Sequence, residues 1–301
     1  MPLTLLATRA IVRSSAVFAM WFGLSEFPVT TAAEPVRLTT DGKSKTDPVF
    51  VKGGEEVIYT VQESPTQMAL MRLRLSDRTT ERLHPDATQN EFEPAFSPDG
   101  STYAFIQSRG NLNLKLVIRD TKAAKDSQFD PGGGFASLRR PTFSPNGSRI
   151  AFSLPAASGQ QIVTIDRQGA DQKTLTSGGL NNWPCYSPDG NRLVFSSSRD
   201  GDFDLYTMKS NGENVQRLLA RPGLDARPVW SPDGKRIAFT GNRNGSYDIM
   251  LVHADGSGLA PLIAHPDRDD YPAWHPDGKQ LIFVGERNGR SDLYLADVPK
   301  S

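Results

Sequence analysis

The chain has 301 residues, of which 34 are Lys or Arg and 34 are Asp or Glu. Because these charges balance, no overall field attracts nucleic acid or an anionic membrane, and we expect neither as a partner. A single cysteine, Cys185, excludes an intramolecular disulfide.

The first 33 residues follow the order of a secretory signal peptide. Arg9 and Arg13 come first, an apolar run over residues 16–24 follows, and small residues stand at 31–33. The apolar run is much shorter than the roughly 20 residues that a membrane-spanning helix needs. We therefore expect residues 1–33 to be a signal peptide, rather than a membrane anchor or the result of a misassigned start codon. The protein would then be periplasmic or secreted, not integral to the membrane, with one domain at 34–301.

From residue 48 onward, one pattern recurs six times. A proline opens a short apolar strand, a tight turn follows, and a second apolar strand comes next. The prolines stand at positions 48, 94, 141, 184, 228 and 272, so the units begin 43 to 47 residues apart. Trp230-Ser-Pro-Asp-Gly234 is a clear copy of the turn, and Phe50-Val-Lys-Gly-Gly54 is a degenerate first copy. In this turn, Pro sets φ at the second position and Gly accepts the left-handed conformation that leads into the next strand.

Each unit continues in the same way after the first turn. In the fifth unit, residues 236–240 alternate between large apolar and small or polar side chains, as a strand does. A second turn at 242–245 leads to Asp248 and a third strand, and a third turn leads to a short fourth strand at 260–263. A unit is therefore a four-stranded antiparallel meander, which at this repeat length is typical of a propeller blade. Six units predict an all-β, six-bladed β-propeller.

The two ends of the repeat region predict how the ring closes. The sixth unit stops after its third strand, and residues 36–39, Val-Arg-Leu-Thr, resemble the fourth strands of the other units. We expect this amino-terminal strand to complete the last blade and so remove two open sheet edges. The alternative is a disordered leader and an open-ended last blade.

The repeats resemble those of the TolB family. Residues 230–239 read Trp-Ser-Pro-Asp-Gly-Lys-Arg-Ile-Ala-Phe and residues 242–250 read Asn-Arg-Asn-Gly-Ser-Tyr-Asp-Ile-Met, which is similar to the WD-like propeller repeats of that family. The resemblance covers nearly all of 36–301 and implies a periplasmic platform that binds the peptidoglycan-associated lipoprotein Pal in the cell envelope. A TolB protein also has an amino-terminal α/β domain, whereas we expect the propeller here to follow the leader almost directly. Similar repeats occur in oligogalacturonate lyases and in prolyl oligopeptidase-like peptidases, so the fold alone does not decide the activity.

The chain offers little for catalysis or metal binding. It has no Gly-x-Ser-x-Gly elbow, which a peptidase of the prolyl oligopeptidase type requires, and its four histidines are scattered along the repeats instead of being set at metal-ligand spacing. We interpret His275, which replaces the turn serine of the other copies, as a solvent-facing residue. Asp200, Asp202 and Asp204 alternate like the start of a calcium loop, but the residues that follow break that pattern. We interpret Asp204 as an acceptor of hydrogen bonds from turn N–H groups, and we expect no cofactor and no metal.

A candidate binding surface follows from the topology. The loops that join fourth strands to first strands, and second strands to third strands, gather at one mouth of a propeller channel. The residues before the six prolines differ in charge and include Trp183, Arg227 and Tyr271, which are of the types most often found at binding hot spots. We predict a binding rim of Phe92, Glu93, Arg139, Arg140, Asn182, Trp183, Arg227, Asp270 and Tyr271. The alternative is that the aromatic members fill gaps between blades; Arg109, Arg199, Arg243 and Arg287 would add either a basic rim or solvated turn residues.

These observations favour an exported, non-enzymatic and monomeric scaffold that binds a protein partner, a Pal-like lipoprotein by resemblance, or the end of a polysaccharide. A second hypothesis is a carbohydrate-active enzyme of the oligogalacturonate-lyase type, with a metal in the channel held by His and carboxylate groups from several blades. A third is a structural protein whose partners bind the outer strands.

Overall fold

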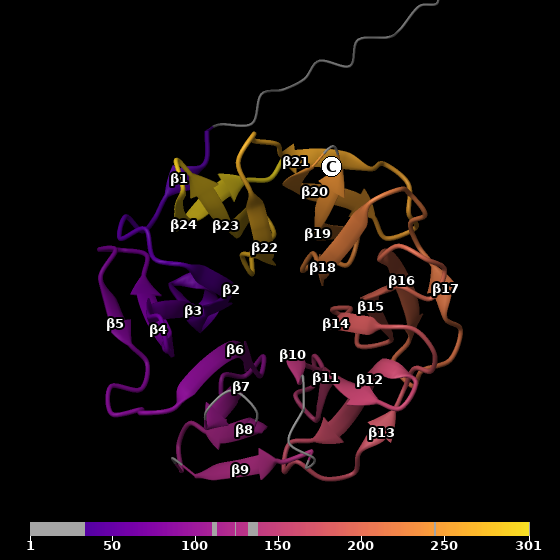
Figure 1. The fold of residues 1–301 in the computed structure, drawn as a ribbon, viewed down its shortest axis with the longest axis horizontal. Coiled ribbons are helices and arrows are strands. Elements are labelled where there is room, and N and C mark those ends of the chain that lie inside the picture. Colours follow the sequence, from indigo (N-terminus) through magenta and orange to yellow (C-terminus); the bar gives the residue numbers. More distant parts are fainter. Residues whose placement is uncertain (1–33, 110–112, 124, 132–137, 244, 301) are drawn as a thin grey trace, which may run out of the picture. The chain divides into compact units, whose positions relative to one another are not determined.

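The computed structural model describes residues 34–109, 113–123, 125–131, 138–243 and 245–300, and the predicted signal peptide lies outside these ranges. Within them the chain forms six four-stranded antiparallel sheets arranged around a central channel (Figure 1). A single turn of 3-10 helix, Lys52–Gly54, is the one helical element of the described residues. The predicted six-bladed all-β propeller is thus confirmed.

In the first five blades the strands run from the channel outward in chain order, and in the sixth β22, β23 and β24 are followed outward by β1. The inner strands are β2 (Lys45–Val51), β6 (Asn90–Phe96), β10 (Arg139–Phe143), β14 (Asn181–Tyr186), β18 (Leu224–Trp230) and β22 (Asp269–Trp274). The second strands are β3 (Glu56–Ser64), β7 (Thr102–Arg109), β11 (Arg149–Ala156), β15 (Arg192–Ser197), β19 (Arg236–Arg243) and β23 (Gln280–Arg287). The third strands are β4 (Gln67–Arg74), β8 (Asn113–Asp120), β12 (Gly159–Asp166), β16 (Asp204–Lys209), β20 (Ser246–His253) and β24 (Arg290–Asp297). The outer strands are β5 (Thr80–Arg82), β9 (Asp126–Phe129), β13 (Lys173–Thr174), β17 (Gln216–Arg217), β21 (Ala260–Ile263) and β1 (Val36–Arg37).

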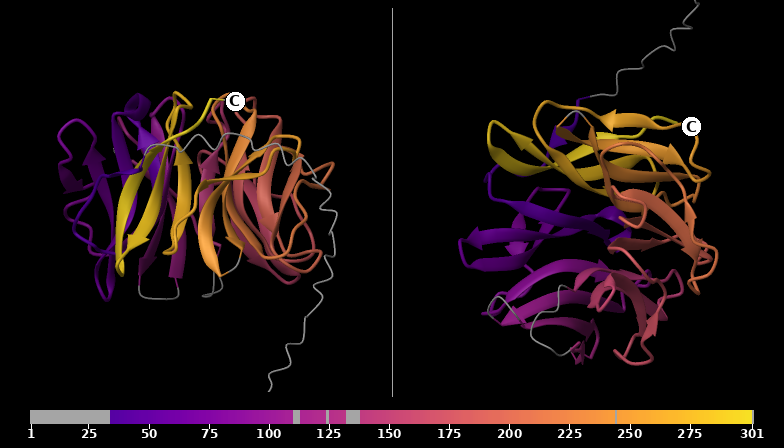
Figure 2. Two further views of the ribbon diagram at one scale, coloured as in Figure 1. Left: turned by 90° about the horizontal axis from the view of Figure 1, so that it is seen from above. Right: turned by 45° about the vertical axis from the view of Figure 1, so that its right-hand side comes forward.

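The Ser-Pro-Asp-Gly turns join inner to second strands through a repeated set of hydrogen bonds. In the second blade, Ser97 Oγ donates to Asp99 Oδ1 at 2.6 Å and accepts from the N–H of Thr102 at 3.0 Å. The glycine that ends each turn has φ between 64° and 73°, the left-handed region that a residue with a Cβ adopts only at a cost. Because all these turns lie at the same end of the inner strands, the other end is left to the longer loops (Figure 2).

The core lies between neighbouring blades. One aromatic residue stands at the same position of every second strand, and all six are at most 1% exposed: Tyr59, Phe105, Phe152, Phe195, Phe239 and Phe283. Buried apolar residues of two adjacent blades surround them, as in the cluster shared by the second and third blades. Burial of a large side chain of this kind stabilises a fold by about 2–3 kcal/mol, so the repeated aromatic position holds the ring of blades together.

The amino-terminal strand completes the last blade, as predicted. β1 pairs with β24, with Val36 opposite Leu295 and Arg37 opposite Tyr294. Side chains reinforce the pairing: Arg37 Nη2 lies 2.5 Å from Asp292 Oδ2, and Thr39 Oγ1 donates to Asp292 Oδ1 at 2.8 Å. The equivalent Asp204 pairs with Arg217 of its own outer strand. The arginine of β1 therefore takes the place that an arginine of the same unit takes in the fourth blade.

The expectation for His275 is wrong. Its side chain is 18% exposed and lies edge-on to Phe50, with 4.9 Å between ring centroids. A Cβ placed on Gly54 would lie 2.1 Å from His275 Nε2. The imidazole therefore occupies the space that the glycine leaves open, between the first and last blades, instead of facing solvent.

Candidate binding site at the channel

The residue before each repeat proline lies at a β-bulge in an inner strand. Pairing with the second strand shifts register across this residue in all six blades, and its φ lies between 49° and 57°. Such a conformation costs a residue other than Gly on the order of 1–3 kcal/mol, and a bulge redirects the side chain. We call these six positions the channel ring: Asp47, Glu93, Arg140, Trp183, Arg227 and Tyr271.

One part of the channel ring is built from charged residues. Arg140 Nη1, from the third blade, lies 2.5 Å from Asp47 Oδ1, from the first blade. The backbone N–H of Arg140 donates to Glu93 Oε2, and Arg139 Nη1 lies 3.3 Å from Glu93 Oε1. The first three blades are therefore connected at the channel by carboxylates and the arginines that face them.

The environment of Glu93 raises the pKa of its carboxyl group. Its side chain is only 10% exposed, and burial, with Asp47 adding negative charge, raises the pKa of Glu93 to about 7. The two arginines act in the opposite direction but do not offset the burial. The neutral form of this carboxyl group is therefore favoured more than it is in an ordinary glutamate.

The other part of the channel ring is aromatic and cationic. The Arg227 guanidinium lies between two rings, with Cζ 5.0 Å from the centroid of Trp183 and 4.2 Å from that of Tyr271. Arg227 Nη1 lies 3.1 Å from Asp270 Oδ1, and Nη2 donates to Tyr271 Oη at 3.3 Å. Stacking of this kind stabilises by roughly 0.5–2 kcal/mol per pair, and burial raises the pKa of Tyr271 to about 12. The phenol is therefore neutral at physiological pH.

The nine predicted rim residues differ in exposure. Glu93, Asn182 and Asp270 are buried, the Arg139 side chain is 48% exposed, and the others are half-buried. The structure gathers seven of the nine into the two groups above and places Phe92 and Asn182 beside them. Phe92 packs against the core of the second and third blades and Tyr271 against that of the first and sixth, so these two aromatics also fill gaps between blades.

Sequence reasoning missed Arg268. Its Nη2 lies 2.5 Å from Asp270 Oδ2, and its side chain is 45% exposed. The guanidinium also lies 4.6 Å from the ring centroid of Tyr247. Its position two residues before Asp270, in the loop that leads to an inner strand, could have indicated from the sequence that it belongs to the site.

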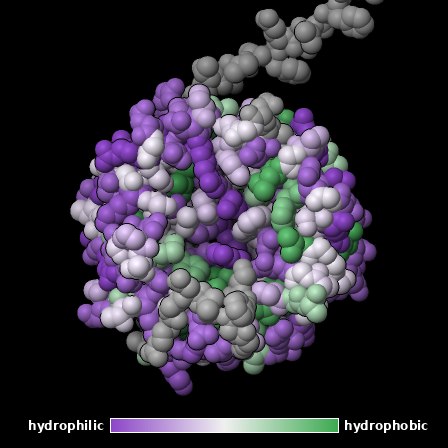
Figure 3. All heavy atoms as spheres, in the orientation of Figure 1, coloured by the Kyte–Doolittle hydropathy of each residue, from purple (hydrophilic) through white to green (hydrophobic). Residues whose placement is uncertain are grey.

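Beyond the channel ring, toward the Ser-Pro-Asp-Gly turns, the channel contains a cavity of about 290 Å³. The aromatic residues that begin the repeated turns contribute to its walls, among them Phe50, Phe96, Phe143, Trp230 and Trp274. From the sequence alone, these residues are expected only to support the scaffold. Seen along the axis, the molecule is hollowed at its centre and mostly hydrophilic around the hollow (Figure 3).

The turn arginines that we considered as a basic rim point back into the blades where their side chains are described. Arg199 Nη2 donates to Asn181 Oδ1 at 2.9 Å, and Arg287 Nη1 lies 2.7 Å from Asp269 Oδ1. The side chains of Arg109 and Arg243 lie outside the described part of the structure. Arg199 and Arg287 therefore connect second turns to inner strands, which neither of the two interpretations from sequence had anticipated.

The acidic run in the fourth blade is arranged for hydrogen bonding. Asp204 accepts the backbone N–H of Arg221 at 3.3 Å, which lies 17 residues further along the chain instead of in the adjoining turn as expected, and its other oxygen faces the Arg217 guanidinium. Asp200 accepts the hydroxyl of Tyr206 at 2.5 Å. Over the described residues, no group of three or more His, Cys, Asp or Glu side chains is placed to hold a metal ion.

The fold and its channel define a class of protein, the six-bladed β-propellers with a closed ring and charged and aromatic side chains at the channel. The family model described as the TolB beta propeller domain matches residues 134–239 and 219–301, which together make up more than half of the chain. The chain therefore belongs to the TolB β-propeller family. None of the helices in the described ranges has the length and apolar character to cross a membrane.

A curated relative and two solved structures show what the chain is similar to. A TolB homologue of Chlorobium chlorochromatii (strain CaD3) is 31% identical over 107 residues, which cover 35% of this chain and 23% of that protein. TolB from Acinetobacter baumannii has a TM-score of 0.69 at 20% identity, covering 82% of this chain and 65% of that chain. An oligogalacturonate lyase of Vibrio parahaemolyticus has a TM-score of 0.59 at 12% identity, covering 89% of this chain and 96% of that chain. At these identities the two solved structures show a shared fold alone.

Proposed function

We propose that this protein is an exported, non-enzymatic scaffold that binds a protein partner of the cell envelope at its channel ring. The observation that carries the proposal is the mismatch between backbone and side chains at the six ring positions. Gly or Asn adopts a φ near +50° at the least cost, yet the chain places Trp183, Arg227 and Tyr271 at three of these positions. A β-bulge that only shaped the blade would not require large side chains that differ from one blade to the next.

The exposed part of this region suggests what the partner presents. Arg139 and Arg268 each pair with a buried carboxylate while about half of their side-chain surface stays exposed. Each guanidinium therefore retains donors for a carboxylate of a partner. Trp183, which stacks with Arg227, is half-buried and adds an aromatic side chain to the channel ring. We infer a partner segment with acidic residues flanking an apolar one.

Membership of the TolB β-propeller family suggests a first candidate for the partner. By resemblance to TolB proteins, we propose a Pal-like peptidoglycan-associated lipoprotein. The predicted signal peptide would bring the chain to the same compartment. Because the match spans about a quarter of the curated TolB homologue's length, the partner and the periplasmic location are proposals for this chain.

Calorimetric titration with the soluble domain of Pal from the same organism tests the proposal. We expect Trp183→Ala to weaken binding by at least about tenfold, because it removes an aromatic anchor. Arg139→Ala should weaken binding by about three- to fivefold, mainly at low salt, as expected of a rim charge. Lys235→Ala, in a Ser-Pro-Asp-Gly turn at the other end of the inner strands, should have no effect.

Thermal unfolding of the same variants separates binding from packing. If Trp183→Ala binds Pal like the wild type but melts at a lower temperature, then Trp183 fills a gap between blades and the proposal is wrong.

A further inference from the structure

Arg139, beside the channel ring, pairs with a buried acid while part of its side chain faces solvent. Its Nη1 lies 3.3 Å from Glu93 Oε1; the Arg139 side chain is 48% exposed and that of Glu93 is 10% exposed. An acidic group of a partner that contacts Arg139 therefore shares this guanidinium with Glu93. Two carboxylates held by one cation repel each other, which disfavours the ionised form of both.

The charged groups that face Glu93 come from the first and third blades. Arg139 faces one carboxylate oxygen, and the backbone N–H of Arg140 donates to the other. The Arg140 guanidinium is engaged by Asp47, with 2.5 Å between Nη1 and Oδ1. On the second strand of the first blade, Thr60 Oγ1 accepts the backbone N–H of Glu93 at 3.1 Å and adds no charge. Arg139 is therefore the cation that acts most strongly on the Glu93 carboxylate.

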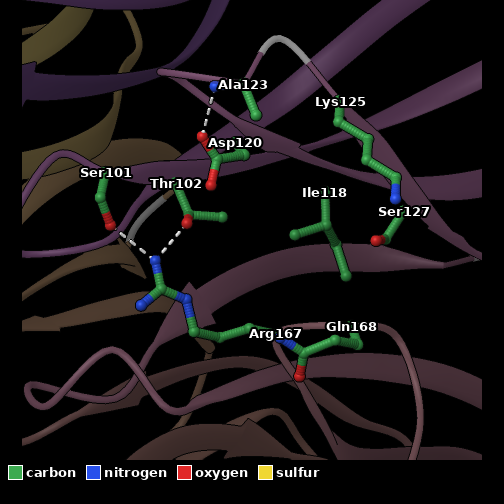
Figure 4. Close-up of a pocket in the computed structure, with 9 residues that line it drawn as sticks. All are labelled: Ser101, Thr102, Ile118, Asp120, Ala123, Lys125, Ser127, Arg167 and Gln168. Carbon is green, nitrogen blue, oxygen red and sulfur yellow. Dashed lines mark hydrogen bonds between the residues drawn. The ribbon is translucent and has the colours of Figure 1, made fainter.

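An arginine that is held by neutral groups shows the difference. Arg167, in the third turn of the third blade, donates through Nη2 to the hydroxyl groups of Ser101 and Thr102 in the second blade (Figure 4). Serine and threonine hydroxyls do not ionise at physiological pH, so these hydrogen bonds do not change with pH. The pairing of Arg139 with Glu93 does change, because protonation removes the charge that attracts the guanidinium.

An acidic group bound at Arg139 would change the proton affinity of Glu93. It competes for the guanidinium and brings negative charge close to a buried acid, and both effects favour the protonated form of Glu93. The pKa of Glu93 is already raised to about 7 by burial and by the charge of Asp47. Protonated Glu93 in turn leaves Arg139 available to the carboxylate of a partner. Binding and protonation therefore favour each other.

We propose that binding of an acidic partner segment at Arg139 is coupled to the uptake of a proton by Glu93, so that affinity rises as the pH falls from about 8 to about 6. The proton comes from solvent and goes to Oε1, the oxygen that faces Arg139, while Oε2 keeps the N–H of Arg140. This inference rests on the proposed function, since it concerns the same site and partner, and it adds a regulation of that site by pH.

Calorimetric titration with the soluble domain of Pal at about pH 6 and about pH 8 tests the inference. The measured quantity is the ratio of the two affinities, which we expect to be about fivefold larger in the wild type than in Glu93→Gln. This value follows if the partner raises the proton affinity of Glu93 about tenfold. Arg139→Gln, which removes the shared cation, should lose the same pH dependence. Glu55→Gln, at an exposed position of the first blade, should keep it.

The same titration in two buffers of different ionisation enthalpy counts the protons. At about pH 7 the wild type should take up about 0.4 proton per complex more than Glu93→Gln does. An affinity ratio in the wild type no larger than in Glu93→Gln and Arg139→Gln would overturn the inference and leave the proposed function intact. If Glu93→Gln does not fold, the comparison with Arg139→Gln decides alone. Absence of Pal binding at both pH values would contradict the proposed function and the inference together.

Discussion

At the scale of single residues, the channel ring combines strain with burial. Glu93 has a left-handed backbone, a buried carboxyl group and a pKa raised to about 7 by burial and by Asp47. Strained and perturbed residues gather at functional sites more often than elsewhere. Here they stand on inner strands that the surrounding sheets hold in place, so the strain belongs to the site and not to a mobile loop.

The raised pKa of Glu93 predicts a pH-dependent stability. The folded protein binds this proton more tightly than the unfolded chain, so the stability contributed by Glu93 is present at low pH and falls as pH rises from about 4.5 to about 7. Glu93→Gln removes the ionisation. We expect the stability of Glu93→Gln relative to the wild type to be higher at about pH 8 than at about pH 5, by on the order of 2 kcal/mol.

Denaturant unfolding at the two pH values measures this difference, and Glu55→Gln, at an exposed position of the first blade, serves as the control. An equal difference between Glu93→Gln and the wild type at both pH values would contradict the argument.

The sequence could indicate the ring positions, because six equivalent places carry unlike residues, but not their geometry. The ion pair between Asp47 and Arg140 joins units that are not adjacent in the chain. Its existence depends on the width of the channel, which the repeat does not encode. The positive φ was also hidden, since a residue before proline usually adopts an extended conformation.

At the scale of elements, the closing strand is the feature that the sequence predicted most directly. The pairing of Val36–Arg37 with β24 could be predicted because these residues have the same side-chain pattern as the other outer strands. Thr39 extends the contact, since its buried Oγ1 donates to Asp292 and accepts the N–H of Leu293 at 3.0 Å. His275 shows the limit of such reasoning, because its neighbour Gly54 lies in the first unit.

Thr39→Val tests the closure with little change of shape. The substitution leaves the Leu293 N–H and one Asp292 oxygen without this partner in a buried setting, and we expect a loss of about 1–3 kcal/mol of unfolding free energy. Thr80→Val, on the exposed outer strand of the first blade, should change stability by no more than about 0.5 kcal/mol. Chemical denaturation of both variants measures the effect; equal small losses would mean that the closing strand contributes little.

At the scale of the whole molecule, the six blades share a scaffold and differ in what they present. Turns and core aromatics repeat because each blade must pack against the next, and this regularity made the fold predictable. The channel ring arises where copies depart from the pattern. Such departures are visible in the sequence, but their chemistry is set by side chains that the closed ring brings together.

The central claim is that the channel ring binds the envelope partner, and the titration of Trp183→Ala with Pal tests it most directly. We predict at least about tenfold weaker binding with an unfolding temperature within a few degrees of the wild type. Wild-type affinity in a destabilised Trp183→Ala protein would contradict the claim.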